Sequence, residues 1–265
     1  MMNAKEFYDA GQLSEAIKAV TEQVKSQPNV IEHRGFLCEL LLVAREWERA
    51  DKQLDVIGHQ NPQAITGVSL WRQLLRASQA REQFFRDGRV PEVLATPDAL
   101  LRKYLQASVL MREQKFAEAT EALAQAEQLR PHCSGKINDH NFSDLRDLDD
   151  LAPGILELFT STGKYYWVPL SRVLSIEFFP PESALDIVFR RAHIEITEEG
   201  PEGDVYLPSV YHRLPEKDPE PCLLARTTDW LASENAPVIG LGQKMFLYDD
   251  EAISILEIEQ LQINH

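Results

Sequence analysis

Residues 107–131, ASVLMREQKFAEATEALAQAEQLRP, contain the pattern that decides the fold of the first half of this 265-residue chain. A small residue is followed by an apolar one, an alanine, a leucine and a proline at fixed spacing. These positions are Ala107, Leu110, Ala119, Leu123 and Pro131. Small side chains let two helices cross closely, and a proline ends a helix. The stretch therefore predicts a helical hairpin.

The same pattern occurs twice nearer the N-terminus. One copy is Ala4, Phe7, Ala16, Val20 and Pro28, and another is Cys38, Leu41, Ala50, Leu54 and Pro62. The first two copies are 34 residues apart and the third follows 69 residues later, close to twice that period. A degenerate middle copy of the repeat would end at Pro97, after Gln83-Phe84-Phe85. A repeat of this length predicts hairpins that stack on one another.

The period and the positions of the small residues resemble tetratricopeptide repeats, which stack into a curved solenoid. Arg34 and Lys103 replace the usual large aromatic residue of the first helix, and the glycine between the helices survives only as Gly11. The alternative is an ordinary helical bundle in which the alanines recur by chance.

Composition changes near residue 135. Residues 1–134 carry 18 acids and 17 bases, whereas residues 135–265 carry 24 acids and 10 bases. We predict a tetratricopeptide-like helical domain over 1–134, an acidic linker over 135–153 and an antiparallel β domain over 154–265. The fold class is therefore α+β. The net charge of −15 argues against a nucleic-acid partner.

The pattern of the second half predicts β-strands, because short runs of β-branched and aromatic residues alternate with Gly, Pro and Asp. The candidate strands are 154–160, 165–168, 173–179, 187–197, 205–211, 222–227, 244–248 and 253–263. The turns are too short for crossover helices. An antiparallel sheet or a small barrel is therefore expected.

The acidic run before these strands does not match a calcium loop. It comprises Asp139, Asp144, Asp147, Asp149 and Asp150. A loop counted from Asp147 would need glycine at its sixth position, where Ala152 stands. A solvated linker is the favoured interpretation.

We find little sign of catalytic chemistry or of a cofactor site. Nucleophile-elbow and phosphate-loop motifs are absent. The segment 240–244, GLGQK, is favoured as a bend before a strand, and His132, Cys133, Asp139 and His140 lack the spacing of a zinc site. His212 with Asp229 or Glu216 is the only hint of an acid–base pair, and it defines the alternative of a hydrolase-like or modifying enzyme.

Neither a membrane span nor a secretory signal is expected, because the apolar runs are only a few residues long. Cys38, Cys133 and Cys222 fit no disulfide framework, which favours a reducing cytoplasm. The oligomeric state stays open.

A curved array of hairpins offers an inner groove that can hold a partner's segment. The repeat register places seven residues there: Tyr8, Glu39, Val43, Tyr104, Ser108, Met111 and Arg112. They form the predicted partner site, unless several of them pack against a neighbouring helix. The predicted long helix 65–87 adds a basic stripe, Trp71, Arg72, Arg76, Arg81 and Arg86, facing acidic groups of a partner or of this chain's own second half.

The second half resembles the ImpE family, also called SciE or TagJ, in a series of motifs. They are 163–169 (GKYYWVP), 176–178 (IEF), 180–181 (PP), 186–192 (DIVFRRA), 203–208 (GDVYLP), 228–230 (TDW) and 240–247 (GLGQKMFL). Phe189 stands where the family prefers Trp. The resemblance implies a non-enzymatic, cytoplasmic adaptor of a type VI secretion system. It further implies binding to a helix of the small contractile-sheath subunit and a link to the ClpV-type disassembly ATPase.

Overall fold

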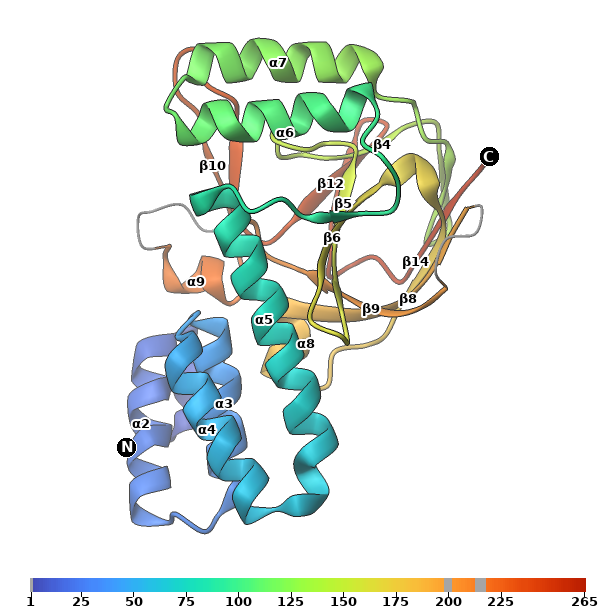
Figure 1. The fold of residues 1–265 in the computed structure, drawn as a ribbon. Coiled ribbons are helices and arrows are strands. Elements are labelled where there is room, and N and C mark those ends of the chain that lie inside the picture. Colours follow the sequence, from blue (N-terminus) through green and yellow to red (C-terminus); the bar gives the residue numbers. More distant parts are fainter. Residues whose placement is uncertain (1, 198–201, 213–217) are drawn as a thin grey trace.

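The structure, a computed structural model, describes residues 2–197, 202–212 and 218–265. Helices fill the first half and most of the strands lie in the second, which confirms the α+β prediction (Figure 1). The helices of the first half are α1 (Ala4–Asp9), α2 (Leu13–Ser26), α3 (Ile31–Val43), α4 (Trp47–Gln60), α5 (Ile65–Asp87), α6 (Ala99–Arg112) and α7 (Phe116–Leu129).

Three hairpins, α1–α2, α3–α4 and α6–α7, follow the register that the repeat predicts. Their turns place Gly11, Arg45 and Gln114 at the same point, with φ of 78°, 59° and 60°. In each turn the amide of the next residue donates to the carbonyl five positions earlier. This is the αL ending typical of helix C-termini. The turns thus repeat even where glycine has been replaced.

The middle copy differs from the prediction, because it contains only one helix. Helix α5 runs through Gln79, the expected turn position, and ends at Gly88, which has φ of 82°. The chain then becomes extended and adds β1 (Glu92–Val93) to the sheet. Phe84 packs on Trp167 with ring centroids 4.7 Å apart, so the end of α5 is held by the sheet. As a result α1–α4 and α6–α7 lie at opposite ends of α5 (Figure 1).

The second half contributes thirteen strands, two short α-helices and the single 3-10 turn η2 (Leu170–Arg172) among the described residues. The strands are β2 (Gly135–Ile137), β3 (His140–Phe142), β4 (Leu145–Asp147), β5 (Ile155–Thr160), β6 (Tyr165–Pro169), β7 (Val173–Phe178), β8 (Phe189–Ile196), β9 (Gly203–Pro208), β10 (Thr228–Leu231), β11 (Ile239–Gly242), β12 (Met245–Tyr248), β13 (Glu251–Ser254) and β14 (Gln260–Ile263). The helices are α8 (Ala184–Val188) and α9 (Glu220–Leu223).

Nine strands form one open sheet in the order β1-β6-β5-β9-β8-β7-β14-β2-β3. The pairings are antiparallel except that of β1 with β6. Its edges, β1 and β3, do not pair with each other, so the sheet is not a closed barrel. Two smaller sheets, β10-β11 and β13-β12-β4, complete the β part.

The stretch 135–153, for which the composition predicts a solvated linker, instead forms β2, β3 and β4. Asp147 and Asp149 are only 3% and 7% exposed. Buried carboxylates are tolerated when cations and amides satisfy them, and both aspartates have such partners. One apolar core also runs across residue 134, joining helical residues such as Leu42 and Leu74 to Phe159 and Phe189 of the sheet.

Candidate functional site: the junction of helix α5 with the sheet

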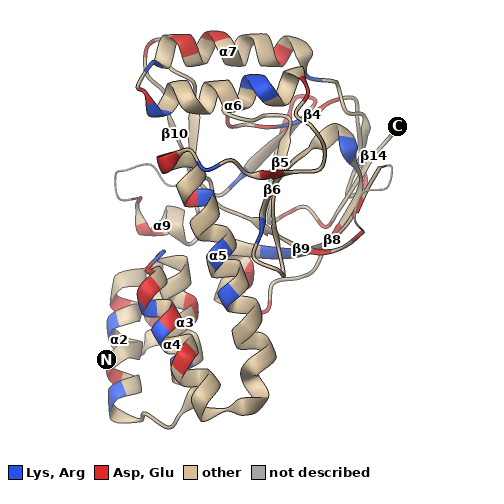
Figure 2. Ribbon diagram, in the orientation of Figure 1, with Lys and Arg blue, Asp and Glu red and all other residues tan. Residues whose placement is uncertain are grey.

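Helix α5 meets the sheet through a buried ion pair. Figure 2 shows basic residues along the middle of this helix. The guanidinium of Arg81 donates from Nε and Nη2 to the two carboxylate oxygens of Glu157 on β5, each at 2.7 Å. The two side chains are each 8% exposed. A bidentate pair of this kind fixes the angle as well as the distance between helix and strand.

A second cation, Lys244, continues the network from the opposite side. Its Nζ lies 3.0 Å from a carboxylate oxygen of Glu157 and 3.0 Å from one of Asp147. Burial alone would raise the pKa of Glu157, but the charges of Arg81 and Lys244 outweigh it and hold that pKa well below its usual range. Glu157 therefore stays ionised, and two cations share it.

The aromatic motif at 165–167 belongs to the same network. The Tyr165 hydroxyl donates to Glu157 at 2.6 Å, and the Trp167 indole N–H donates to the Tyr165 oxygen at 2.5 Å. Trp167 and Tyr165 are 1% and 2% exposed. These polar tips are thus satisfied inside the core, as buried Tyr and Trp require. The motif supports the carboxylate that holds α5.

The glycine-rich segment before Lys244 closes the far side of the network. A Cβ on Gly240 would lie 2.3 Å from the Tyr211 ring, so only glycine fits there. The Gly240 amide donates to Asp149 at 2.9 Å, and the Tyr211 hydroxyl donates to Asp147 at 2.9 Å. Burial and the neighbouring Asp147 raise the pKa of Asp149 to about 7.

Two small cavities, of about 50 and about 30 Å³, are both lined by Arg81 and His212. Pockets for organic ligands are usually about 300 Å³ or more, so these have room only for water. His212 stacks on Phe85 with centroids 3.7 Å apart. Burial and the charge of Arg81 lower its pKa to about 3, which leaves the imidazole neutral.

The structure does not assemble the acid–base pair suggested by the sequence. Asp229 is exposed on β10 and accepts a hydrogen bond from the amide of Trp230. Glu216 lies outside the described residues. Across 2–197, 202–212 and 218–265, we find no group of three or more His, Cys, Asp or Glu side chains placed to hold a metal ion. Within the same ranges, none of the helices combines the length and the apolar character needed to span a bilayer.

The predicted partner residues fall into two groups on different sides of α5. The group on α6 comprises Tyr104, Ser108, Met111 and Arg112. Tyr104 is 1% exposed and its hydroxyl accepts a hydrogen bond from the Gly154 amide at 3.3 Å, while the Ser108 hydroxyl donates to the Tyr104 carbonyl. Met111 is half-buried, and half-buried Arg112 donates to the Phe84 carbonyl at 3.1 Å.

Tyr8, Glu39 and Val43 form the other group, on α1 and α3. Tyr8 is buried beneath Arg226, whose guanidinium lies 5.2 Å from its ring. Glu39 accepts a hydrogen bond from the Ala184 amide of α8 at 3.2 Å. Val43 is 3% exposed.

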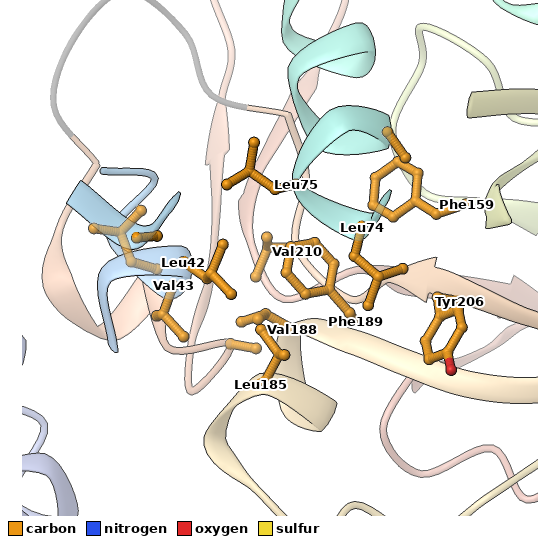
Figure 3. Packing of buried hydrophobic residues seen from close by; sticks show 14 of the residues in the cluster. Leu42, Val43, Leu74, Leu75, Phe159, Leu185, Val188, Phe189, Tyr206 and Val210 are labelled. Atoms are coloured by element: carbon orange, nitrogen blue, oxygen red, sulfur yellow. The ribbon is translucent and has the colours of Figure 1, made fainter. Parts of the chain in front are cut away.

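The inner face of α3 is therefore not open, contrary to the expectation from the repeats. Figure 3 shows Leu42 and Val43 packed toward Leu185 and Val188 of α8, with Val210 beside them. Short β connections and α8 fill the groove because the sheet, held by α5, brings their apolar side chains against the hairpins. The predicted groove is occupied by this chain itself.

Three positions of the basic stripe predicted on α5 form ion pairs within this chain. Arg86 pairs with Glu82 and Asp87 near the end of α5. Arg81 pairs with Glu157 of the second half, whereas Arg72 pairs with Asp51 and Asp55 of α4 at 2.8 and 3.1 Å. The sequence pattern places Arg81 in the stripe but does not indicate Glu157 and Lys244 as the other members of its charge network. A charged residue within the apolar run 155–159 was the available signal.

Together these features define a class of protein in which stacked helical hairpins are locked to an open antiparallel sheet by a buried charge network. The ImpE protein profile matches residues 139–262. The chain is also 32% identical, over 98% of its length and 90% of the other's, to the type VI secretion system accessory component TagJ of Pseudomonas aeruginosa. The chain belongs to the ImpE family.

A solved structure shares the whole fold. The crystal structure of protein VPA1032 from Vibrio parahaemolyticus superimposes with a TM-score of 0.91 at 30% identity. The match covers 99% of this chain and 97% of that one.

Proposed function

We propose that this protein is a non-enzymatic, cytoplasmic adaptor of a type VI secretion system. In this proposal it binds a helix of the small contractile-sheath subunit and is linked to the ClpV-type disassembly ATPase. The observation that carries the proposal is the 32% identity, along 98% of the chain, to a protein named as an accessory component of such a system. The geometry of the junction agrees, because its charged groups are engaged with one another and its cavities have room only for water.

The seven residues predicted for partner contact stay a prediction. Tyr8, Val43, Tyr104 and Ser108 are at most 6% exposed, so they would meet a partner only if the β part moved away from the helices. Met111 and Arg112, at the end of α6, keep part of their surface in solvent. Glu39 is also partly exposed, but it already accepts a hydrogen bond from the Ala184 amide of α8. We therefore propose Met111 and Arg112 as the members of the set that touch a partner without rearrangement.

Purified small sheath subunit from the same secretion cluster tests the proposal. The full-length chain, immobilised, should retain the subunit, and the Arg112→Ala variant should retain less. Lys136→Ala, at an exposed position on β2, is the matched control and should bind as the natural chain does. Failure of the natural chain to retain the subunit would overturn the proposed function. Equal binding by Arg112→Ala and the natural chain would remove Arg112 from the contact.

The link to the ATPase needs a separate measurement. Purified ClpV-type ATPase from the same cluster should be retained by the immobilised chain, directly or through the sheath subunit. If neither arrangement retains it, the adaptor proposal is reduced to sheath binding.

A further inference from the structure

Helix α5 is a first helix without a second one. In the repeat register Arg72 of α5 corresponds to Cys38 of α3 and to Ala107 of α6. In the hairpins α3–α4 and α6–α7 this position lies at the crossing with the second helix. Cys38 and Ala107 are 0% exposed, and the Cys38 thiol lies 3.6 Å from the Ala50 carbonyl of α4. The chain after α5 is extended, so it supplies no second helix.

The side chain at this position shows that α5 is uncovered there. The Arg72 side chain is 33% exposed, although its counterparts are fully buried. Leu75, which corresponds to Leu41 and Leu110, keeps the apolar character of the register and is 6% exposed. The face of α5 that a second helix would cover therefore keeps an apolar residue, the buried Leu75, and is open to solvent at Arg72.

A groove of about 380 Å³ runs between α4 and α5 on this side. It is lined by Trp47, Glu48, Asp51, Arg72, Leu75, Arg76 and Gln79. Trp47 is half-buried, and its indole N–H donates to Glu82 at 2.9 Å. Trp47 and Leu75 give the groove an apolar part, and the other five lining residues are polar or charged. This combination suits an amphipathic helix.

The charges on the rim are not all balanced. Arg72 is neutralised by Asp51 and Asp55. Arg76 is exposed, and its guanidinium is 3.4 Å from the amide oxygen of Gln73. Among the residues that the structure describes, no carboxylate forms an ion pair with Arg76. A partner could therefore supply an acidic side chain at this point.

We propose that the groove between α4 and α5 binds an amphipathic helix of a partner protein, which takes the place of the missing second helix and offers a carboxylate to Arg76. The inference rests on the proposed function and gives its helix a binding site near α4, whereas Met111 and Arg112 lie on α6 at the other end of α5 and would contact another part of the same subunit. A helix is the occupant because α4 covers the equivalent position in the preceding hairpin. An extended strand would find no partner, since the backbone groups within α4 and α5 are engaged in their own helices.

The full-length chain and purified small sheath subunit provide the test. Arg76→Glu should weaken binding at least about tenfold, because it replaces an attraction by a repulsion. Lys52→Glu is the matched control: it makes the same change of charge at an exposed position of α4 outside the groove, and should bind as the natural chain does. Equal thermal unfolding temperatures of both variants would show that neither alters the fold.

A cross-linking measurement locates the contact independently. The native Cys38, Cys133 and Cys222 are at most 5% exposed, so a cysteine introduced at Glu48 can be labelled selectively with a photoreactive group. Glu48→Cys should cross-link to the sheath subunit, and Lys52→Cys should not.

The outcomes separate the two proposals. If the natural chain binds the subunit but Arg76→Glu binds equally well and Glu48→Cys forms no cross-link, the groove assignment is wrong and the adaptor function stands. If the natural chain does not bind the subunit, the proposed function fails and the groove assignment fails with it.

Discussion

Two of the junctions between the helical part and the β part have opposite character. At one, Arg81 of α5 enters a network of charges around Glu157. At the other, the apolar face of α3 packs on α8 through Leu42, Val43 and Leu185. Apolar burial supplies free energy with little directional preference, whereas a buried ion pair adds little net stability but depends strongly on its geometry. The comparison suggests that the apolar junction stabilises the association and the charged junction sets its angle.

The largest effect is expected at the charged junction. Glu157→Ala leaves Arg81 and Lys244 buried without their shared carboxylate, and breaking a buried pair costs about 3–5 kcal/mol. Urea unfolding should show this loss in the free energy of unfolding. Glu22→Ala is the control, because Glu22 pairs with Lys25 at the surface and its loss should cost less than about 1 kcal/mol. Similar losses in the two variants would contradict a structural role for the network.

A somewhat smaller loss in the free energy of unfolding is expected from Leu185→Ala at the apolar junction. Leu185 is 3% exposed, and truncating a buried leucine to alanine costs about 2–4 kcal/mol through lost burial and the cavity left behind. The same urea experiment measures it. Leu129→Ala, at a position 47% exposed, should change the free energy of unfolding by only a few tenths of a kcal/mol. A loss at Leu185 as small as the one at Leu129 would mean that α8 contributes little to holding α3.

The apolar junction also contains the titratable side chain of Glu39, next to the Ala184 amide of α8. Burial raises the pKa of Glu39 to about 7, and the nearby Asp186 adds to the rise, although the Ala184 amide opposes it. Because the folded-state pKa lies above the unfolded value, the folded protein binds more protons between those pKa values, and its stability falls as pH rises through that window. Between about pH 5 and about pH 8, the free energy of unfolding should therefore fall by roughly 1 kcal/mol less for Glu39→Gln than for the natural protein. The figure is kept small because Glu39 is partly exposed.

Thermal unfolding of both proteins across that pH range measures the difference. Asp149, whose pKa is also raised to about 7, contributes to both curves and cancels on subtraction. Parallel curves for the variant and the natural protein would show that Glu39 titrates at its ordinary pKa.

The two junctions were unequally accessible from the sequence. The hairpins could be predicted, because the spacing of Ala16, Ala50 and Ala119 is local and each alanine is fully buried in the structure. The end of the middle copy could not be predicted. Helix α5 continues through Gln79 because of a tertiary contact, the packing of Phe84 on Trp167. Local pattern gives no account of a contact between residues so far apart in the chain.

The charged junction escaped prediction for a related reason. Asp147 and Asp149 lie in an acidic run that is typical of a solvated linker, and their partners are distant in sequence, as Lys244 is. A carboxylate is buried only when such partners are present, and the sequence does not show which residues will meet. The family motifs around Trp167 and Gly240 marked the right residues, although their roles became clear only from the contacts.

The smallest predicted effect compares two hairpin turns, one of which touches the junction. Gln114 has φ of 60° and is exposed, so Gln114→Gly should remove backbone strain and raise the free energy of unfolding by about 0.5–1 kcal/mol. Arg45, in the same conformation, also donates to the Tyr211 carbonyl at 3.1 Å. Arg45→Gly gains the same relief but loses that hydrogen bond, worth about 1.5–3 kcal/mol for a charged donor, so it should be neutral or destabilising. The difference between the variants in urea unfolding measures what Arg45 contributes across the junction. Equal stabilisation by both glycines would show that its bond to Tyr211 contributes nothing.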